Sequence, residues 1–130
     1  LMVRGAAGVV TDGGFRDAMN IAKLEIPTYQ NRPSSPTNLT INEAISINEP
    51  IGCGDAPVFP GDIVVGDDAG VIIIPAFLAN EVAYEAYEMT TYENFVMEQV
   101  QQGATIIGLY PATKEENLTK FAEWREIKKR

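Results

Sequence analysis

The sequence contains no histidine and a single cysteine, Cys53. The lack of histidine excludes Ser-His-Asp and Cys-His catalysis, histidine-ligated zinc and an imidazole base. One cysteine excludes an internal disulfide and a cysteine-rich metal site, and without an activating base we interpret Cys53 as a small apolar side chain. The chemistry that remains uses carboxylates, arginine, lysine, tyrosine, backbone amides, or a hard metal ion with oxygen ligands such as Mg²⁺ or Mn²⁺.

Positive charge is also scarce, with 10 Lys and Arg against 18 Asp and Glu and a formal net charge of −8. Nucleic-acid binding needs Lys and Arg against phosphates, so we expect no nucleic-acid partner. The one basic cluster, residues 128–130, is typical of a helix end that complements the helix dipole. No apolar run is long enough to span a membrane, and the first residues lack a signal-peptide pattern. We therefore expect a cytoplasmic protein without membrane contact.

The composition is that of an ordinary globular protein, with 45% apolar and 22% charged residues among 130. This length predicts one domain over residues 1–130, long enough to bury a core. The chain begins without Met and reads as though it started inside an element, which suggests a fragment or a processed chain.

The first part of the chain predicts short strands around one short helix. Apolar and β-branched runs predict strands, and a proline- and serine-rich stretch predicts a loop. The clearest pattern is a hairpin, in which the β-branched runs 63–65 and 71–74 flank the turn sequence "GDDAG". The other expected elements are strands over 6–11, 26–29 and 44–52, the last of them broken by Pro50, together with a helix over 16–24 and a loop over 31–40.

The period becomes helical over residues 76–102. Leu78, Val82, Ala86 and Met89 form one apolar stripe, and Gly103 is typical of a residue just beyond a helix end. Residues 113–116 match a capping box, which predicts a last helix with three apolar side chains facing inward, namely Leu118, Phe121 and Trp124. The fold class is therefore α/β, with a β-rich middle followed by C-terminal helices.

The corner "TDGGFRD" carries the strongest candidate site residues. Arg16 can hold a carboxylate through two hydrogen bonds, and the neighbouring Asp17 can ligate a divalent ion or cap a helix. Asp12 can form the turn or brace Arg16. On the residues alone, a surface loop with a capping aspartate explains the same pattern.

Other acidic residues have simpler interpretations. Asp67 and Asp68 suit the hairpin turn, although two carboxylates can also bind a metal. Glu81, Glu85 and Glu88 are typical of a solvated helix face, from which Glu93 stands slightly apart.

The segments "GAAGVVTDGGFRD" and "PIGCGDAPVFPGDIVVGDDAGVIIIP", with "QGATIIGLY" after the long helix, resemble the RraA-like family. This family includes 4-hydroxy-4-methyl-2-oxoglutarate aldolases, which also decarboxylate oxaloacetate, and protein regulators of ribonuclease activity. The resemblance implies a β/β/α swivelling domain, assembled as a homotrimer or homohexamer with sites at subunit interfaces. It covers the C-terminal portion of such a domain.

The resemblance also implies roles for individual residues. Arg16 would bind the carboxylate of a 2-keto acid substrate and Asp17 would ligate Mg²⁺ or Mn²⁺, so that pyruvate is released by a metal-dependent lyase. Glu93 would be the catalytic acid supplied by a neighbouring subunit, and Asp12 would support the site. Asn20 stands where the aldolase pattern has an acid, and an amide can hydrogen-bond a metal-bound water without acting as a base.

Two other functions remain open from the sequence. One is a regulator that binds a ribonuclease E-type partner without catalysis. Asp17 disfavours this function, because the regulators carry at that position a residue that cannot ligate a metal. The other is an inactive fragment or structural subunit, because the aldolases supply a Gly-Asp segment farther upstream than the 15 residues that precede Arg16.

Overall fold

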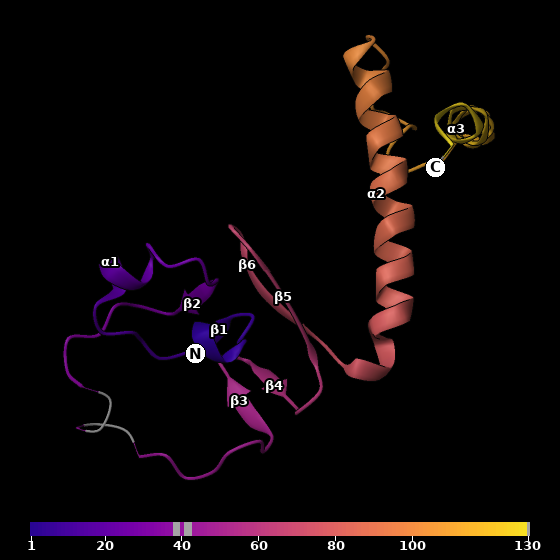
Figure 1. Ribbon diagram of the computed structural model, residues 1–130. Helices are drawn as coiled ribbons and strands as arrows, with labels where there is room; N and C mark the ends of the chain where they lie inside the picture. The colour runs from indigo at the N-terminus through magenta and orange to yellow at the C-terminus, as the bar shows by residue number, and fades with distance from the viewer. Residues whose placement is uncertain (38–39, 41–42, 130) are drawn as a thin grey trace. The chain divides into compact units, whose positions relative to one another are not determined.

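The protein, seen here in a computed structural model, is described over residues 1–37, 40 and 43–129. It consists of two compact units, Leu1–Phe77 and Leu78–Arg130 (Figure 1). The first unit holds small sheets and the second holds two helices, which confirms the predicted mixed α/β class with a β-rich part followed by C-terminal helices. The prediction that both units form one domain stays a prediction.

The described strands of the first unit form three two-stranded sheets. The first sheet is parallel and the other two are antiparallel, and the helical segments are short. The elements of this unit are η1 (Met2–Arg4), β1 (Val9–Thr11), α1 (Ala18–Ile21), β2 (Thr28–Gln30), β3 (Ile51–Cys53), β4 (Ala56–Val58), β5 (Ile63–Asp67) and β6 (Gly70–Ile74), and η3 (Ala76–Leu78) leads into the second unit.

The hairpin predicted around "GDDAG" is confirmed as β5 and β6. Asp67 pairs with Gly70 at its end, and the Asp67 carboxylate accepts hydrogen bonds from the backbone N–H groups of Ala69, at 2.8 Å, and Gly70, at 3.2 Å. These bonds close the turn, so the structural interpretation of Asp67 agrees with its geometry.

Several predicted elements are shorter than expected. The strand expected over 44–52 is wrong for most of its length, because β3 begins only at Ile51. Asn48 adopts a left-handed φ of 60°, and Pro50 has no N–H to donate, so neither suits a paired strand. Within the expected loop over 31–40, the described residues form neither strand nor α-helix, and residues 38 and 39 lie outside the description.

The second unit packs α3 (Glu115–Lys128) against α2 (Ala79–Gln101), and Figure 1 shows the two helices crossing rather than lying parallel. Its buried cluster consists of Phe95, Val96, Leu109 and Trp124, with Tyr92 and Phe121 packed against it. Aromatic rings meet edge-on in this cluster, the favourable geometry for such pairs: the ring centroids are 5.0 Å apart between Tyr92 and Phe121 and 5.8 Å between Phe95 and Trp124.

The apolar stripe predicted for α2 is only partly correct. Leu78 and Val82 are half-buried, but Met89 is 58% exposed. Leu118 on α3, predicted to face inward, is 50% exposed. The buried side chains of α2 are instead Thr91, Phe95 and Val96, all in its C-terminal half. Phe95 contacts Phe121 and Trp124 of α3 at the point where the helices cross, and a helical period in one segment does not contain that crossing point.

The end of α2 is formed as predicted. Gly103 has a φ of 94°, its N–H bonds to the Val100 carbonyl at 2.9 Å, and the Ala104 N–H bonds to the Gln99 carbonyl at 3.0 Å. These two bonds constitute a Schellman motif, which glycine permits because it has no Cβ to resist a positive φ.

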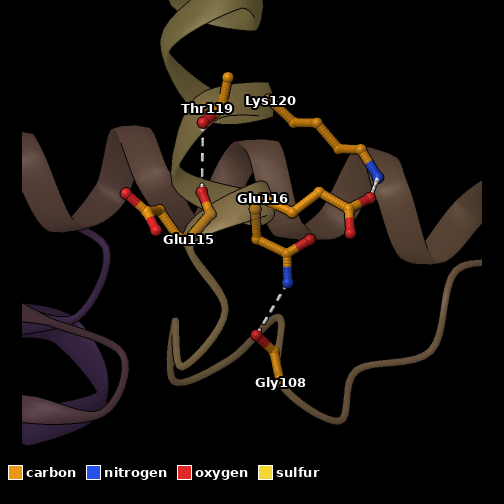
Figure 2. A network of polar contacts seen from close by, with 6 residues as sticks. Gly108, Glu115, Glu116, Thr119 and Lys120 are labelled. Carbon is orange, nitrogen blue, oxygen red and sulfur yellow. Dashed lines mark hydrogen bonds and ion pairs between the residues drawn. The ribbon is translucent and has the colours of Figure 1, made fainter.

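The capping box predicted at the start of α3 is wrong. The N-cap is Lys114, without a side-chain capping bond, so Thr113 lies one residue outside that position. The first turn is instead fixed from within and from the preceding loop: Asn117 Nδ2 donates to the Gly108 carbonyl at 2.8 Å, Thr119 Oγ1 donates to the Glu115 carbonyl at 3.3 Å, and Lys120 pairs with Glu116 (Figure 2).

The expectation that Glu88 belongs to a solvated face is also wrong. Its two carboxylate oxygens accept two hydrogen bonds from Arg125 of α3, at 2.6 and 2.7 Å. These hydrogen bonds hold the pKa of Glu88 below its ordinary value. Because Arg125 lies 37 residues farther along the chain, the pattern of α2 alone contains no sign of this pair.

The Glu88 pair predicts an acid-sensitive contribution to the second unit. A carboxyl whose pKa is lower in the folded state stabilises the fold above its unfolded pKa and loses that contribution as the pH falls through its folded pKa. We expect the wild type to lose stability between about pH 5 and pH 3, and Glu88→Gln to show a shallower dependence there. Urea unfolding followed by the fluorescence of Trp124, the single tryptophan, measures this.

Glu85→Gln is the matched control, because Glu85 is exposed on the same helix one turn earlier. It should follow the wild-type acid profile. Parallel profiles for wild type and Glu88→Gln would contradict the assignment.

Candidate functional site

The candidate site is the loop that connects β1 to α1, residues 12–17. β1 runs parallel to β2, with Thr11 opposite Gln30, so the segments that follow the two strands leave from the same edge of the sheet. Loops at the carboxyl ends of parallel strands are common positions for ligand sites. The predicted succession of strand, turn and helix is therefore present around "TDGGFRD", although the helix is limited to Ala18–Ile21.

Gln30, the last residue of β2, and the residues 31–34 after it hold this loop by three hydrogen bonds. The Asn31 N–H donates to the Gly13 carbonyl at 3.0 Å, and the Ser34 N–H donates to the Phe15 carbonyl at 3.0 Å. The Phe15 N–H in turn donates to the side-chain Oε1 of Gln30 at 2.6 Å. The loop backbone is thus fixed on both sides of Phe15, directly before Arg16.

Gly14 is required by the same close approach. A Cβ at Gly14 would lie 2.1 Å from the Arg32 carbonyl oxygen and 3.0 Å from the Ser34 Cβ. Backbone atoms cannot give way at that distance, so any larger residue would push the loop off the segment that holds it.

Arg16 and Asp17 project from this fixed loop into solvent. Their side chains are 57% and 67% exposed, and Arg16 Nε lies 3.9 Å from the Asp17 carboxylate. Such an exposed, long ion pair contributes little to stability. Asp17 precedes α1 with a left-handed φ of 59° and makes no side-chain capping bond, so its carboxylate is not used to start the helix.

The two residues predicted to support the site, Asp12 and Asn20, have different surroundings. Asp12 Oδ2 accepts a hydrogen bond from the Gly54 N–H at 3.1 Å, which joins the candidate loop to the turn between β3 and β4. Cys53, the last residue of β3 before that turn, is a free, half-buried thiol. Asn20 is exposed on α1, and its backbone N–H donates to the Asp17 carbonyl at 2.9 Å.

Glu93 belongs to the second unit, where it is exposed on α2. One of its oxygens accepts a hydrogen bond from the Tyr110 hydroxyl at 3.1 Å, and this bond raises the pKa of Tyr110. Whether Glu93 acts together with Arg16 and Asp17 stays a prediction.

No group of three or more His, Cys, Asp or Glu side chains able to hold a metal ion occurs among the described residues. A divalent ion at Asp17 would therefore take most of its ligands from water and substrate, which is the usual arrangement for Mg²⁺. The exposed carboxylate, free of a capping role, fits that arrangement.

Among the residues that the structure describes, no helix combines the length and the apolar character needed to cross a membrane.

Sequence reasoning missed Gln30, whose side chain bonds to the candidate loop from the next strand. It also missed the bond between Asp12 and Gly54, which are 42 residues apart. Neither contact follows from a local motif, since both depend on how the chain returns to the loop.

Comparison with known proteins gives a consistent picture. A family model described as RraA-like (Aldolase/RraA) matches residues 1–73. An uncharacterized protein of Methanocaldococcus jannaschii is 32% identical over 103 residues, covering 78% of this chain and 48% of that protein. A protein of Halalkalibacterium halodurans, named "Putative 4-hydroxy-4-methyl-2-oxoglutarate aldolase", is 38% identical over 71 residues, covering 55% of this chain and 33% of that protein.

Among solved structures, the crystal structure of an uncharacterized protein from Pseudomonas syringae pv. tomato matches with a TM-score of 0.79. It is 23% identical, and the match covers 84% of this chain and 51% of that one, so it supports the fold. The present chain spans between a third and a half of the length of the curated relatives that it matches.

Proposed function

This chain belongs to the RraA-like family, and on that premise we propose that it is part of a divalent-metal-dependent carbon–carbon lyase acting on a 2-keto acid. The observation that carries the proposal is the pairing of Arg16 and Asp17 on one loop that is fixed to the segment after β2 while both side chains stay exposed. An anion clamp and an oxygen ligand side by side suit a substrate that has adjacent carboxylate and keto oxygens. The name of the H. halodurans relative supports an aldolase-type reaction.

Each residue of the loop has a distinct proposed role. The Arg16 guanidinium binds the substrate carboxylate through two parallel hydrogen bonds and offsets its charge. The Asp17 carboxylate would hold Mg²⁺ or Mn²⁺, and such an ion supplies Lewis-acid polarisation of the keto oxygen. Asn20 would orient a water molecule by hydrogen bonding, because an amide does not accept a proton as a base.

The reaction also needs a proton. Cleavage leaves the bonding electron pair on the 2-keto fragment, while the other fragment departs as CO₂ from oxaloacetate or, once its hydroxyl has lost a proton, as a carbonyl compound from an aldol. Release of pyruvate then requires that its new terminal carbon be protonated. We assign this acid–base role to Glu93, contributed by a neighbouring copy in a homotrimer or homohexamer. The proposed location of the enzyme is the cytoplasm.

Release of pyruvate from oxaloacetate tests the proposal. With the full chain and Mg²⁺ or Mn²⁺, we expect pyruvate to appear faster than with the metal alone, since bare divalent ions set the background rate. EDTA should return the rate to the level without protein and metal, and added Mn²⁺ should restore it. The measurement is coupled detection of pyruvate under saturating substrate.

The metal-only reaction is the control, and a rate no faster than this control would overturn the lyase proposal. Stoichiometric capture of a ribonuclease E-type protein in the absence of turnover would favour the regulator instead.

A further inference from the structure

Gln30 is a side chain that neither the sequence motif nor the proposed chemistry accounts for, yet it contacts the candidate loop directly. It ends β2, is half-buried, and accepts the Phe15 N–H at 2.6 Å through its Oε1. Phe15 precedes Arg16, and Asp17 follows, so this bond lies one residue from the clamp and two from the metal ligand.

The exposed side chains of the site have little else to fix them. Arg16 and Asp17 are more than half exposed, and their mutual ion pair is long. Side chains without packing take their positions from the backbone that carries them, so the φ of 59° at Asp17 matters for where its carboxylate lies. A left-handed residue other than glycine persists when the surrounding structure holds it there.

Gln30 differs from Asn31 and Ser34, which also hold the loop, because its contribution is a side chain. The bonds from Asn31 to Gly13 and from Ser34 to Phe15 join backbone atoms and survive side-chain replacement. The Gln30 bond does not survive, and its loss leaves the Phe15 N–H without that acceptor.

We propose that Gln30 is a positioning residue, whose hydrogen bond to the Phe15 N–H sets the loop geometry in which Arg16 binds the substrate and Asp17 holds the metal. This inference rests on the proposed function for its catalytic consequence. The hydrogen bond itself is independent of that function and is tested separately.

The experiment compares three variants of the full chain. Gln30→Met keeps the length of the side chain and removes the acceptor, whereas Gln30→Glu keeps an acceptor oxygen in the same place. Asn31→Leu is the matched control. It replaces the polar side chain next to Gln30, while the backbone N–H of residue 31 still donates to the Gly13 carbonyl. Mn²⁺ binding is measured by titration, pyruvate release by steady-state kinetics, and protection of the Phe15 amide by hydrogen exchange.

We expect Gln30→Met to weaken Mn²⁺ binding and to lower kcat/KM by about tenfold each, the effect of one unsatisfied donor. The Phe15 amide should exchange about tenfold faster by the same reasoning. Gln30→Glu should restore all three quantities toward wild type, and Asn31→Leu should leave them unchanged. A merely structural role would lower the urea midpoint without changing the Mn²⁺ affinity of the folded protein.

Two results overturn the inference: wild-type Phe15 exchange in Gln30→Met, or wild-type Mn²⁺ affinity and kcat/KM in that variant while exchange is faster. Failure of the wild type itself would count against the proposed function instead. If the wild type binds no Mn²⁺ and releases no pyruvate, the lyase proposal fails, and faster Phe15 exchange in Gln30→Met would still support the structural part of the inference.

Discussion

Replacement of Asp17 with asparagine is expected to bring pyruvate release down to the metal-only rate. The substitution removes the negative charge that a divalent ion requires and keeps nearly the same side-chain size. Asparagine also tolerates a left-handed backbone, so the φ of 59° at this position should persist. Changes to residues that merely support metal ligands cost about 10- to 100-fold, so loss of the ligand itself should exceed about 100-fold. Steady-state kinetics with saturating Mn²⁺ measure the effect.

Asp68→Asn is the control for this prediction. Asp68 is an exposed aspartate in the β5–β6 turn of the same unit, and its replacement changes the net charge by the same amount. It should keep wild-type turnover. Equal activity in Asp17→Asn and wild type would remove Asp17 from the metal site.

Replacement of Phe95 with alanine is expected to cost about 3–5 kcal/mol of the unfolding free energy of the second unit. Phe95 is 1% exposed and is the largest side chain buried to this degree among the described residues. Its ring centroid lies 5.5 Å from that of Phe121 and 5.8 Å from that of Trp124, so truncation opens a cavity between α2 and α3. The change is measured by urea unfolding with Trp124 fluorescence.

Met97→Ala provides the comparison, because Met97 lies on the same helix and is 59% exposed. Its loss should change stability by no more than about 0.5 kcal/mol. If the two variants were equally stable, the aromatic cluster would not be the core of the second unit.

The elements with local patterns were predictable from the sequence. The β5–β6 hairpin follows from two β-branched runs around a turn. The end of α2 follows from Gly103, because glycine adopts the positive φ that the helix end requires. The predictions were wrong where contacts with a distant segment determine the pairing or burial of a side chain. Glu88 is paired, and Met89 exposed, because α3 crosses α2 at a point that the helical period of α2 does not contain.

The candidate site was predictable to a similar extent. The strand–turn–helix context placed Arg16 and Asp17 at the corner after β1, where they lie, but the expected helix over 16–24 included both residues, whereas α1 begins only at Ala18. The groups that fix the loop were not predictable, since Gln30 and Gly54 come from segments 15 and 42 residues away from their partners. The start of α3 was misplaced by one residue because Lys114, rather than the hydroxyl of Thr113, occupies the N-cap.

The β5–β6 hairpin has a practical consequence for work with this chain in solution. All five residues of β5 are exposed, including Val64 at 49% and Val65 at 47%, and neighbouring residues of a strand face opposite sides. Apolar strands with open edges are templates for pairing between molecules. The net charge of −8 opposes such contacts at neutral pH, but this repulsion vanishes near the sequence pI of 4.4. Colloidal stability should therefore decline as the pH approaches the pI, so light scattering should accompany any acid titration of the chain.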